Sequence, residues 1–161
     1  MSKNINIKLT KLVKYYSLIN HNLIFNNKSI NRYNKMQPNI QKDKTKSLKK
    51  LREEIKNIKD CKLKENASNL VFSDGNPNSK IMIIGEGPGA NEDKEGLPFV
   101  GRAGQLLDKM LHAINLNREK VYITNVVNYR PPENRKPSKK EVEKYLPYLR
   151  RHIEIIKPNI I

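Results

Sequence analysis

A short apolar run followed at once by a glycine-rich loop is the feature that most restricts how this chain can fold. Residues 81–84 read Ile-Met-Ile-Ile, which suits a buried strand. A loop at residues 85–101 follows, and Gly101 opens a helix whose apolar positions keep to one stripe. These positions are Ala103, Leu106, Leu107, Met110, Leu111 and Ile114. With a second β-branched strand at residues 121–127, this order predicts an α/β fold with a parallel sheet covered by helices.

The flanking segments extend this prediction on the N-terminal side. Leu48, Leu51, Ile55 and Ile58 mark the buried face of a first helix. A turn is then predicted at residues 74–77, where Asp, Gly, Asn and Pro follow one another.

The last part of the chain predicts one more helix and the start of a third strand. The prolines of residues 130–137 forbid a regular helix or strand there. Ser138 and Glu141 have the spacing of a capping box and predict that a helix begins at this point. Residues 159–161 look like the first residues of a third strand.

The charge of the chain is strongly positive and unevenly distributed. The 161 residues suit one domain, and 32 Lys+Arg stand against 16 Asp+Glu. This excess suits nucleic acid or an anionic membrane surface as a partner, and it is equally expected of an AT-rich coding sequence without a binding role. Residues 1–42 contain 8 basic residues and no acidic one. We therefore expect a basic Asn/Lys-rich extension at residues 1–44, disordered or a lone helix, ahead of a domain at residues 45–161.

A single cysteine, Cys61, excludes an internal disulfide and predicts a cytoplasmic protein. No apolar run approaches the ~18 residues that a membrane span needs, so no membrane partner is expected.

Two loops, residues 85–101 and 124–137, each follow a predicted strand and therefore lie at the same edge of a parallel sheet. Together they can form one pocket. The first brings glycines that let a ligand approach the backbone, carboxylates and the aromatic face of Phe99. Residues 85–90 also fit the dinucleotide-binding pattern G-x-G-x-x-A, which makes a nicotinamide-dependent enzyme an alternative. Pro88 and Pro98 count against it, because that motif needs a helix beginning within the glycines.

Several segments together resemble one known family. They read IMIIGEGPG (81–89), NEDKEGLPFVGRAGQLLDKML (91–111), VYITNVV (121–127) and RPPENRKP (130–137). This combination is similar to the bacterial and archaeal uracil-DNA glycosylases of the iron-sulfur type, known as family 4, and the likeness runs from about residue 53 to residue 161. The resemblance implies a three-layer α/β fold with a central parallel sheet. It also implies base excision repair, in which the N-glycosidic bond of uracil in DNA is hydrolysed.

The resemblance also implies roles for six residues. Glu86, Glu92 and Asn134 match catalytic positions that place water and stabilise the transition state. Gly87, Phe99 and Asn125 match substrate-binding positions, where Phe99 stacks on uracil and Asn125 reads the base edge. The chemistry is suitable, because an extruded base needs a stacking face and an amide that both donates and accepts hydrogen bonds.

The chain departs from the family at the iron-sulfur cluster. The family holds this cluster through four cysteines, and this chain has Ile58, Cys61, Tyr129 and Tyr145 at those positions. Four thiolates normally coordinate such clusters. We therefore expect no cluster and no other cofactor, with Cys61 a small buried hydrophobe.

The family also continues with further strands and a His-containing motif that has no counterpart in this sequence. We therefore expect a domain that is incomplete at its C-terminus and an impaired glycosylase, with a complementary C-terminal chain as a candidate partner besides uracil-containing DNA. The alternative is a non-catalytic remnant or half-protein that binds DNA or is associated with a phage-type DNA polymerase.

Overall fold

The computed structural model describes residues 38–161, with side chains from residue 43 onward. The first described helix, α2, runs from Pro38 to Lys56. The expectation of a disordered or helical extension at residues 1–44 therefore lies mostly outside the described residues.

A small sheet forms the centre of the described domain. Its strands are β1 (Ser73–Gly75), β2 (Met82–Gly85) and β3 (Tyr122–Asn125), in the order β1-β3-β2. β2 and β3 run parallel, with Met82 opposite Tyr122 and Gly85 opposite Asn125. This arrangement confirms the strand–helix–strand unit predicted from the sequence.

β1 lies in a segment for which the sequence predicts a turn. It pairs antiparallel with β3, with Asp74 opposite Ile123. Side chains from β3 and the residues after it support this segment: Thr124 Oγ1 donates to the carbonyl of Phe72 at 2.7 Å, and Asn128 Nδ2 donates to the carbonyl of Val71 at 3.0 Å. The predicted turn is therefore wrong for Asp74 and Gly75, because tertiary hydrogen bonds and not a local apolar pattern form this strand.

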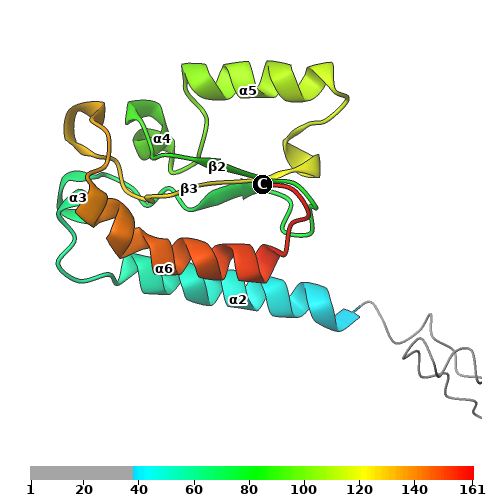
Figure 1. Ribbon diagram of the computed structural model, residues 1–161, viewed down its shortest axis with the longest axis horizontal. Coiled ribbons are helices and arrows are strands. Elements are labelled where there is room, and N and C mark those ends of the chain that lie inside the picture. The colour runs from blue at the N-terminus through cyan, green and yellow to red at the C-terminus, as the bar shows by residue number, and fades with distance from the viewer. Residues whose placement is uncertain (1–37) are drawn as a thin grey trace, which may run out of the picture. The chain divides into compact units, whose positions relative to one another are not determined.

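Helices cover both faces of the sheet and produce three layers (Figure 1). α5 (Arg102–Ala113) lies on one face, and α2 and α6 (Lys139–Ile156) lie on the other. Side chains alternate along the strands: Met82 and Tyr122 enter the core on the side of α2 and α6, whereas Ile83 and Ile123 enter a smaller core under α5. Four short elements lie in the segments that connect the long helices and the strands along the chain. They are α3 (Lys62–Asn66), α4 (Ala90–Glu95), η1 (Arg118–Lys120) and η2 (Pro132–Asn134).

α2 and α6 pack against each other. α2 buries the face that the sequence predicts, and α6 begins where the sequence predicts. The predicted apolar residues Leu48, Leu51, Ile55 and Ile58 are all buried, although Ile58 lies just after the end of α2. α6 begins with the predicted capping box, in which the backbone N–H of Ser138 donates to the Glu141 carboxylate at 2.7 Å. Within the described part of the chain, no helix is both long and apolar enough to cross a membrane.

α5 departs from the buried stripe that its sequence predicts. Leu111 is buried, but Leu106, Met110 and Ile114 are 59%, 61% and 64% exposed. The prediction is wrong for these three residues and for Ala103, which is also exposed, because nothing in the described part of the chain covers that side of the helix. Apolar periodicity identified the helix correctly without showing how much of the stripe would be covered.

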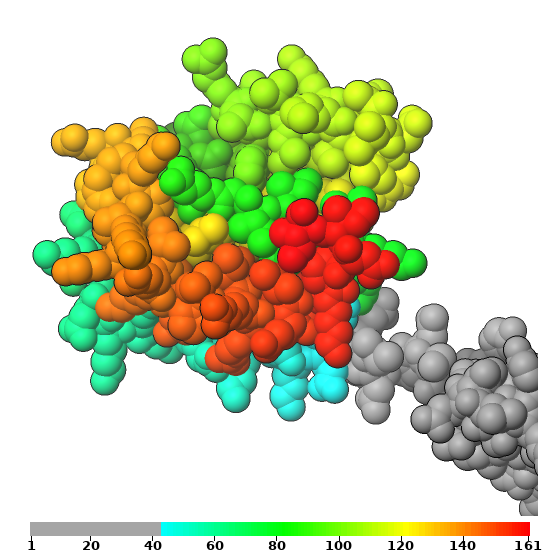
Figure 2. All heavy atoms as spheres, viewed as in Figure 1, coloured from blue at the N-terminus to red at the C-terminus, as the bar shows by residue number. Residues whose placement is uncertain are grey.

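The predicted third strand is represented by a single bridge beside β2. Ile160 pairs in parallel with Ile81, and the N–H of Met82 donates to the carbonyl of Ile160 at 2.9 Å. Figure 2 shows residues 159–161 in red beside green atoms of the β2 region, on a face of the molecule where α5 is also visible. The side chains of Ile160 and Ile161 are largely exposed at this edge of the sheet.

Candidate functional site

A pocket of about 510 Å³ opens where β2 and β3 end. The two strands are parallel, so the loops that follow Gly85 and Asn125 start at the same edge of the sheet. Residues at the beginning of α5 form a further part of the wall. The pocket brings together all six residues that the sequence singles out: Glu86, Gly87, Glu92, Phe99, Asn125 and Asn134.

Phe99 and Asn125 meet across the backbone of Gly85. A Cβ atom at Gly85 would lie 2.4 Å from Asn125 Oδ1 and 2.8 Å from the Phe99 ring, so a side chain here would push the two apart. Asn125 is buried, yet its side-chain amide makes no hydrogen bond to any residue of the described domain. Its donor and its acceptor are therefore available to a ligand in the pocket.

Glu92 joins the two ends of the glycine-rich loop. One carboxylate oxygen accepts a hydrogen bond from the N–H of Gly89 at 3.1 Å. The other accepts from the N–H groups of Val100 and Gly101 at 3.0 and 2.7 Å. The carboxylate is buried, and these three bonds offset the loss of its hydration. Glu92 therefore shapes the loop that carries Phe99.

Glu86 and Asn134 belong to different loops that face each other. Both also line a smaller adjoining cavity of about 140 Å³. Asn134 has a positive φ of 56°, and its Oδ1 accepts a hydrogen bond from Arg130 Nε at 2.8 Å. This bond orients the Asn134 amide, and its NH₂ group forms no hydrogen bond within the described residues, so a donor is available beside the pocket.

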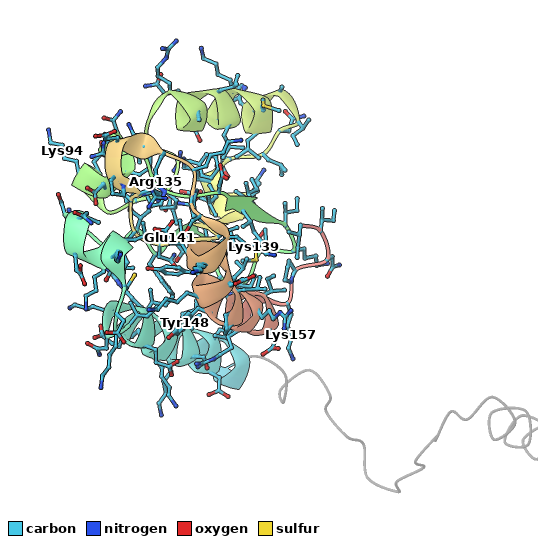
Figure 3. The ribbon with its side chains drawn as sticks, turned by 60° about the vertical axis from the view of Figure 1, so that its left-hand side comes forward. Lys94, Arg135, Lys139, Glu141, Tyr148 and Lys157 are labelled. Atoms are coloured by element: carbon cyan, nitrogen blue, oxygen red, sulfur yellow. The ribbon has the colours of Figure 1, made fainter. Side chains whose placement is uncertain are left out.

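Basic side chains surround the opening, but they are not equivalent. Arg135 forms a two-bond ion pair with Glu141, at 2.8 and 2.7 Å, and Figure 3 shows the two side chains together at the start of α6. Its guanidinium lowers the pKa of the Glu141 carboxyl to about 2. Arg102 lines the main pocket and Lys136 the adjoining cavity, and neither forms an ion pair within the described residues. These two cations are therefore available to a polyanion at the opening.

Asn91 and Arg102 also line the pocket and were not predicted from the sequence. Arg102 is the first residue of α5 and follows the N-cap residue Gly101. The glycine that predicts the start of this helix was a usable signal, because a helix that begins beside the loop brings its first residues to the pocket. Asn91 carried no comparable signal.

The four positions that the resemblance assigns to cluster ligands lie together in the core on the α2 and α6 side. Ile58, Cys61, Tyr129 and Tyr145 are all buried there. Cys61 Sγ and the Tyr145 hydroxyl form a hydrogen bond of 3.1 Å. Burial raises the pKa of the Tyr145 phenol, so this side chain is a neutral hydroxyl and not an anionic ligand. One thiol among neutral and apolar groups does not fit a cluster that four thiolates hold.

Several named proteins are similar in sequence to a large part of this chain. Type-4 uracil-DNA glycosylase of Sulfurisphaera tokodaii is 52% identical over 116 residues, which are 71% of this chain and 53% of that protein. Type-4 uracil-DNA glycosylase of Archaeoglobus fulgidus is 49% identical over 115 residues, 71% of this chain and 58% of that protein. A DNA polymerase of Bacillus phage SP01 is 34% identical over 100 residues, 62% of this chain but 11% of the polymerase.

The chain spans about half the length of the curated glycosylases it matches. The family model of the uracil DNA glycosylase superfamily matches residues 72–161, a segment that contains β2, β3 and every pocket residue named above. A match over more than half of the chain, together with close identity to named members, shows that the chain belongs to the uracil DNA glycosylase superfamily.

Proposed function

We propose that the pocket binds a uracil base extruded from DNA and that the chain supplies part of a uracil-DNA glycosylase site. The observation that carries this proposal is the meeting of the Phe99 ring and the Asn125 amide across Gly85 in a cavity of about 510 Å³. An enzyme that acts on a flipped base needs a stacking surface and hydrogen bonds to the base edge. The names of the relatives support uracil as that base.

In this proposal each of the six residues has a distinct task. Phe99 stacks on uracil, and the Asn125 amide donates to and accepts from the imide edge. Bond cleavage builds positive charge on the sugar, which the carboxylate of Glu86 can stabilise while it and Asn134 orient water. Glu92 positions the loop through its three backbone hydrogen bonds. Gly87 lets the loop backbone beside the pocket pack against the core, because a Cβ there would lie 2.7 Å from Val127 Cγ2.

The exposed side of α5 faces the β2 edge of the sheet. Arg118 donates to Asp108 on α5 and to Asp74 in β1, which places Asp108 on the β1 side. Leu106 and Met110 lie on the opposite side of the helix from Asp108, because residues two positions apart are separated by about 200° in a helix of 3.6 residues per turn. β1 and β2 are at opposite edges of the sheet. The exposed apolar residues are therefore on the same side as the single Ile160 bridge.

We infer that this surface is covered by polypeptide equivalent to the half of the relatives that the chain does not span. A bare sheet edge next to an apolar helix side is what a further strand and helix would bury. Without that cover the pocket is open to water, which weakens the electrostatic help that Glu86 gives. Excision by this chain alone is therefore expected to be weak or absent, and the added half is expected to increase it.

A DNA-binding protein without catalysis is the second candidate. The net charge of +16 and the similarity to a segment of a phage DNA polymerase favour DNA as the partner even where no base is released. If the chain only binds DNA, its affinity for DNA falls steeply as salt rises, because contacts to phosphate dominate.

We also propose the cytoplasm as the compartment of the chain, because the sequence has a single cysteine.

An excision assay separates these candidates. Uracil release is measured from single-stranded DNA by the full chain, alone and mixed with the C-terminal half of the Archaeoglobus fulgidus relative. We expect release to rise in the mixture and to fall with Glu86→Gln, whereas Glu119→Gln, an exposed carboxylate outside the pocket, leaves it unchanged. Binding without release in both samples favours the second candidate. Strong release by the chain alone that Glu86→Gln does not affect would show that the site is wrongly assigned.

We also propose that the chain holds no iron-sulfur cluster, because only Cys61 among the four positions offers a thiolate. The protein is treated anaerobically with iron and sulfide, and bound iron, labile sulfide and visible absorbance are measured. The parent is expected to stay colourless, and the triple variant Ile58→Cys, Tyr129→Cys, Tyr145→Cys is expected to gain iron. Stoichiometric iron in the parent would contradict the proposal.

A further inference from the structure

The backbone of Phe99 has an unusual conformation that its neighbours must hold. Its φ is 56°, in the left-handed region that costs energy for a residue with a side chain. The peptide carbonyl of Phe99 points at α5, where a Cβ atom on Gly104 would lie 1.6 Å from the oxygen. Only a glycine at this position of α5 leaves room for that carbonyl. The ring of Phe99 meanwhile lies against Gly85 at the pocket.

Arg118 binds this segment from another part of the chain. Its Nη2 donates to the carbonyl oxygen of Phe99, and its Nη1 donates to the carbonyl oxygen of Pro98 at 3.2 Å. The same guanidinium donates to Asp74 Oδ2 at 2.9 Å and to Asp108 Oδ1 at 2.8 Å. One side chain thus connects β1, α5 and the loop of Phe99.

The arrangement uses the planar geometry of arginine. The two carboxylates accept from Nε and Nη1, which leaves Nη2 directed at the Phe99 carbonyl. The Arg118 side chain is 25% exposed, so these bonds form partly out of water and restrain the guanidinium strongly. A lysine carries the charge but cannot donate to four acceptors in one plane.

We propose that Arg118 is a positioning residue that sets the stacking face of Phe99. It does not line the pocket, and it acts through the Pro98–Phe99 backbone that it holds against Gly104. A stacking ring is useful only where its face lies parallel to the base, so a loop that shifts by a fraction of an ångström loses the contact. This inference rests on the proposed role of the pocket in binding a base.

The test observes Phe99 directly in the full chain. The protein contains three phenylalanines, so fluorinated phenylalanine gives few ¹⁹F signals, and Phe99→Leu assigns the one from Phe99. Arg118→Gln is expected to shift or broaden the Phe99 signal and to leave that of Phe72, in the other core, unchanged. Arg118→Lys is expected to restore it in part. Lys120→Gln in the same 3-10 turn is the matched control and leaves both signals in place.

Free uracil is the ligand in the second measurement. Its dissociation constant is expected to rise about tenfold in Arg118→Gln, the size of one lost base–aromatic stacking contact. An unmoved Phe99 signal in a folded Arg118→Gln protein overturns the proposal. If that variant does not fold, Asp108→Asn replaces it, with a smaller shift expected and the same overturning result. If the parent binds no uracil, the proposed function fails, and the Phe99 signal still decides whether Arg118 positions that residue.

Discussion

The side of the sheet that faces α2 and α6 and the side that faces α5 are built from the same strands and are covered very differently. On the first side Leu51, Ile55 and Tyr145 are fully enclosed. On the second, the core consists of Leu111, Val121 and Ile123 with partly buried neighbours, and the outer residues of α5 are mostly exposed. The pocket opens at the beginning of α5. The well-covered side therefore stabilises the domain, and the poorly covered side carries the candidate chemistry.

Truncating one apolar side chain on each side gives the largest expected difference. Leu51→Ala, in α2, should lower the free energy of unfolding by about 2–5 kcal/mol, because Leu51 is fully buried and a cavity remains. Met110→Ala, on the exposed side of α5, should change it by less than about 0.5 kcal/mol. Urea unfolding followed by circular dichroism measures both. Equal losses would show that the α5 side is already covered in solution.

Lowering the pH should destabilise the domain through a buried histidine on the side of the sheet that faces α2 and α6. His152 in α6 is buried against Phe72 and Tyr122, with Nε2 2.7 Å from the Tyr122 hydroxyl. Burial lowers its pKa to about 4 from 6.5. Above pH 6.5 the residue is neutral in the folded and unfolded states. Below it the unfolded chain binds the proton more readily, so stability falls as pH drops from about 6.5 to 4, by about 3 kcal/mol in all.

The measurement is the free energy of unfolding against pH for two histidine variants. His152→Gln should remove this part of the slope, and His112→Gln, on the exposed surface of α5, should retain it. A slope that survives in His152→Gln would assign it to other groups.

The next expected effect is on binding at the pocket, and it is smaller than the stability losses described above. Asn125→Ala removes the amide that is open to the ligand and should weaken uracil binding by about 1–3 kcal/mol, the usual cost of a lost hydrogen-bonding partner. Stability should hardly change, because the amide makes no hydrogen bond within the described domain. Calorimetry with uracil, beside thermal unfolding, tests both statements. Reduced stability with unchanged binding would identify Asn125 as a core residue.

The smallest expected effect is at the start of α6. Ser138→Ala removes a helix cap and should cost about 1 kcal/mol of stability. The exposed neighbour Lys139→Ala is the control and should have almost no effect. A cost close to that of Leu51→Ala would show that the loop before α6 belongs to the same cooperative core.

Sequence patterns predicted most of the framework. The spacing of Leu48, Leu51 and Ile55 identified α2, and Ser138 with Glu141 located the start of α6. The loops of Phe99 and Asn125 were expected at one sheet edge because both follow parallel strands, and they do meet there. Their roles in binding and catalysis remain predictions from the resemblance and from the geometry.

The sequence by itself determined the long helices α2, α5 and α6, the strands β2 and β3, and the edge that their loops share, because periodicity, caps and turn residues act over a few neighbouring positions. Only the tertiary structure decided that residues 73–75 form a strand, that most of the predicted α5 stripe is exposed, and that Arg118 holds the backbone of Phe99. Each of these depends on contacts between residues far apart in the chain. Burial follows from what covers a surface, and a local pattern holds no information about that cover.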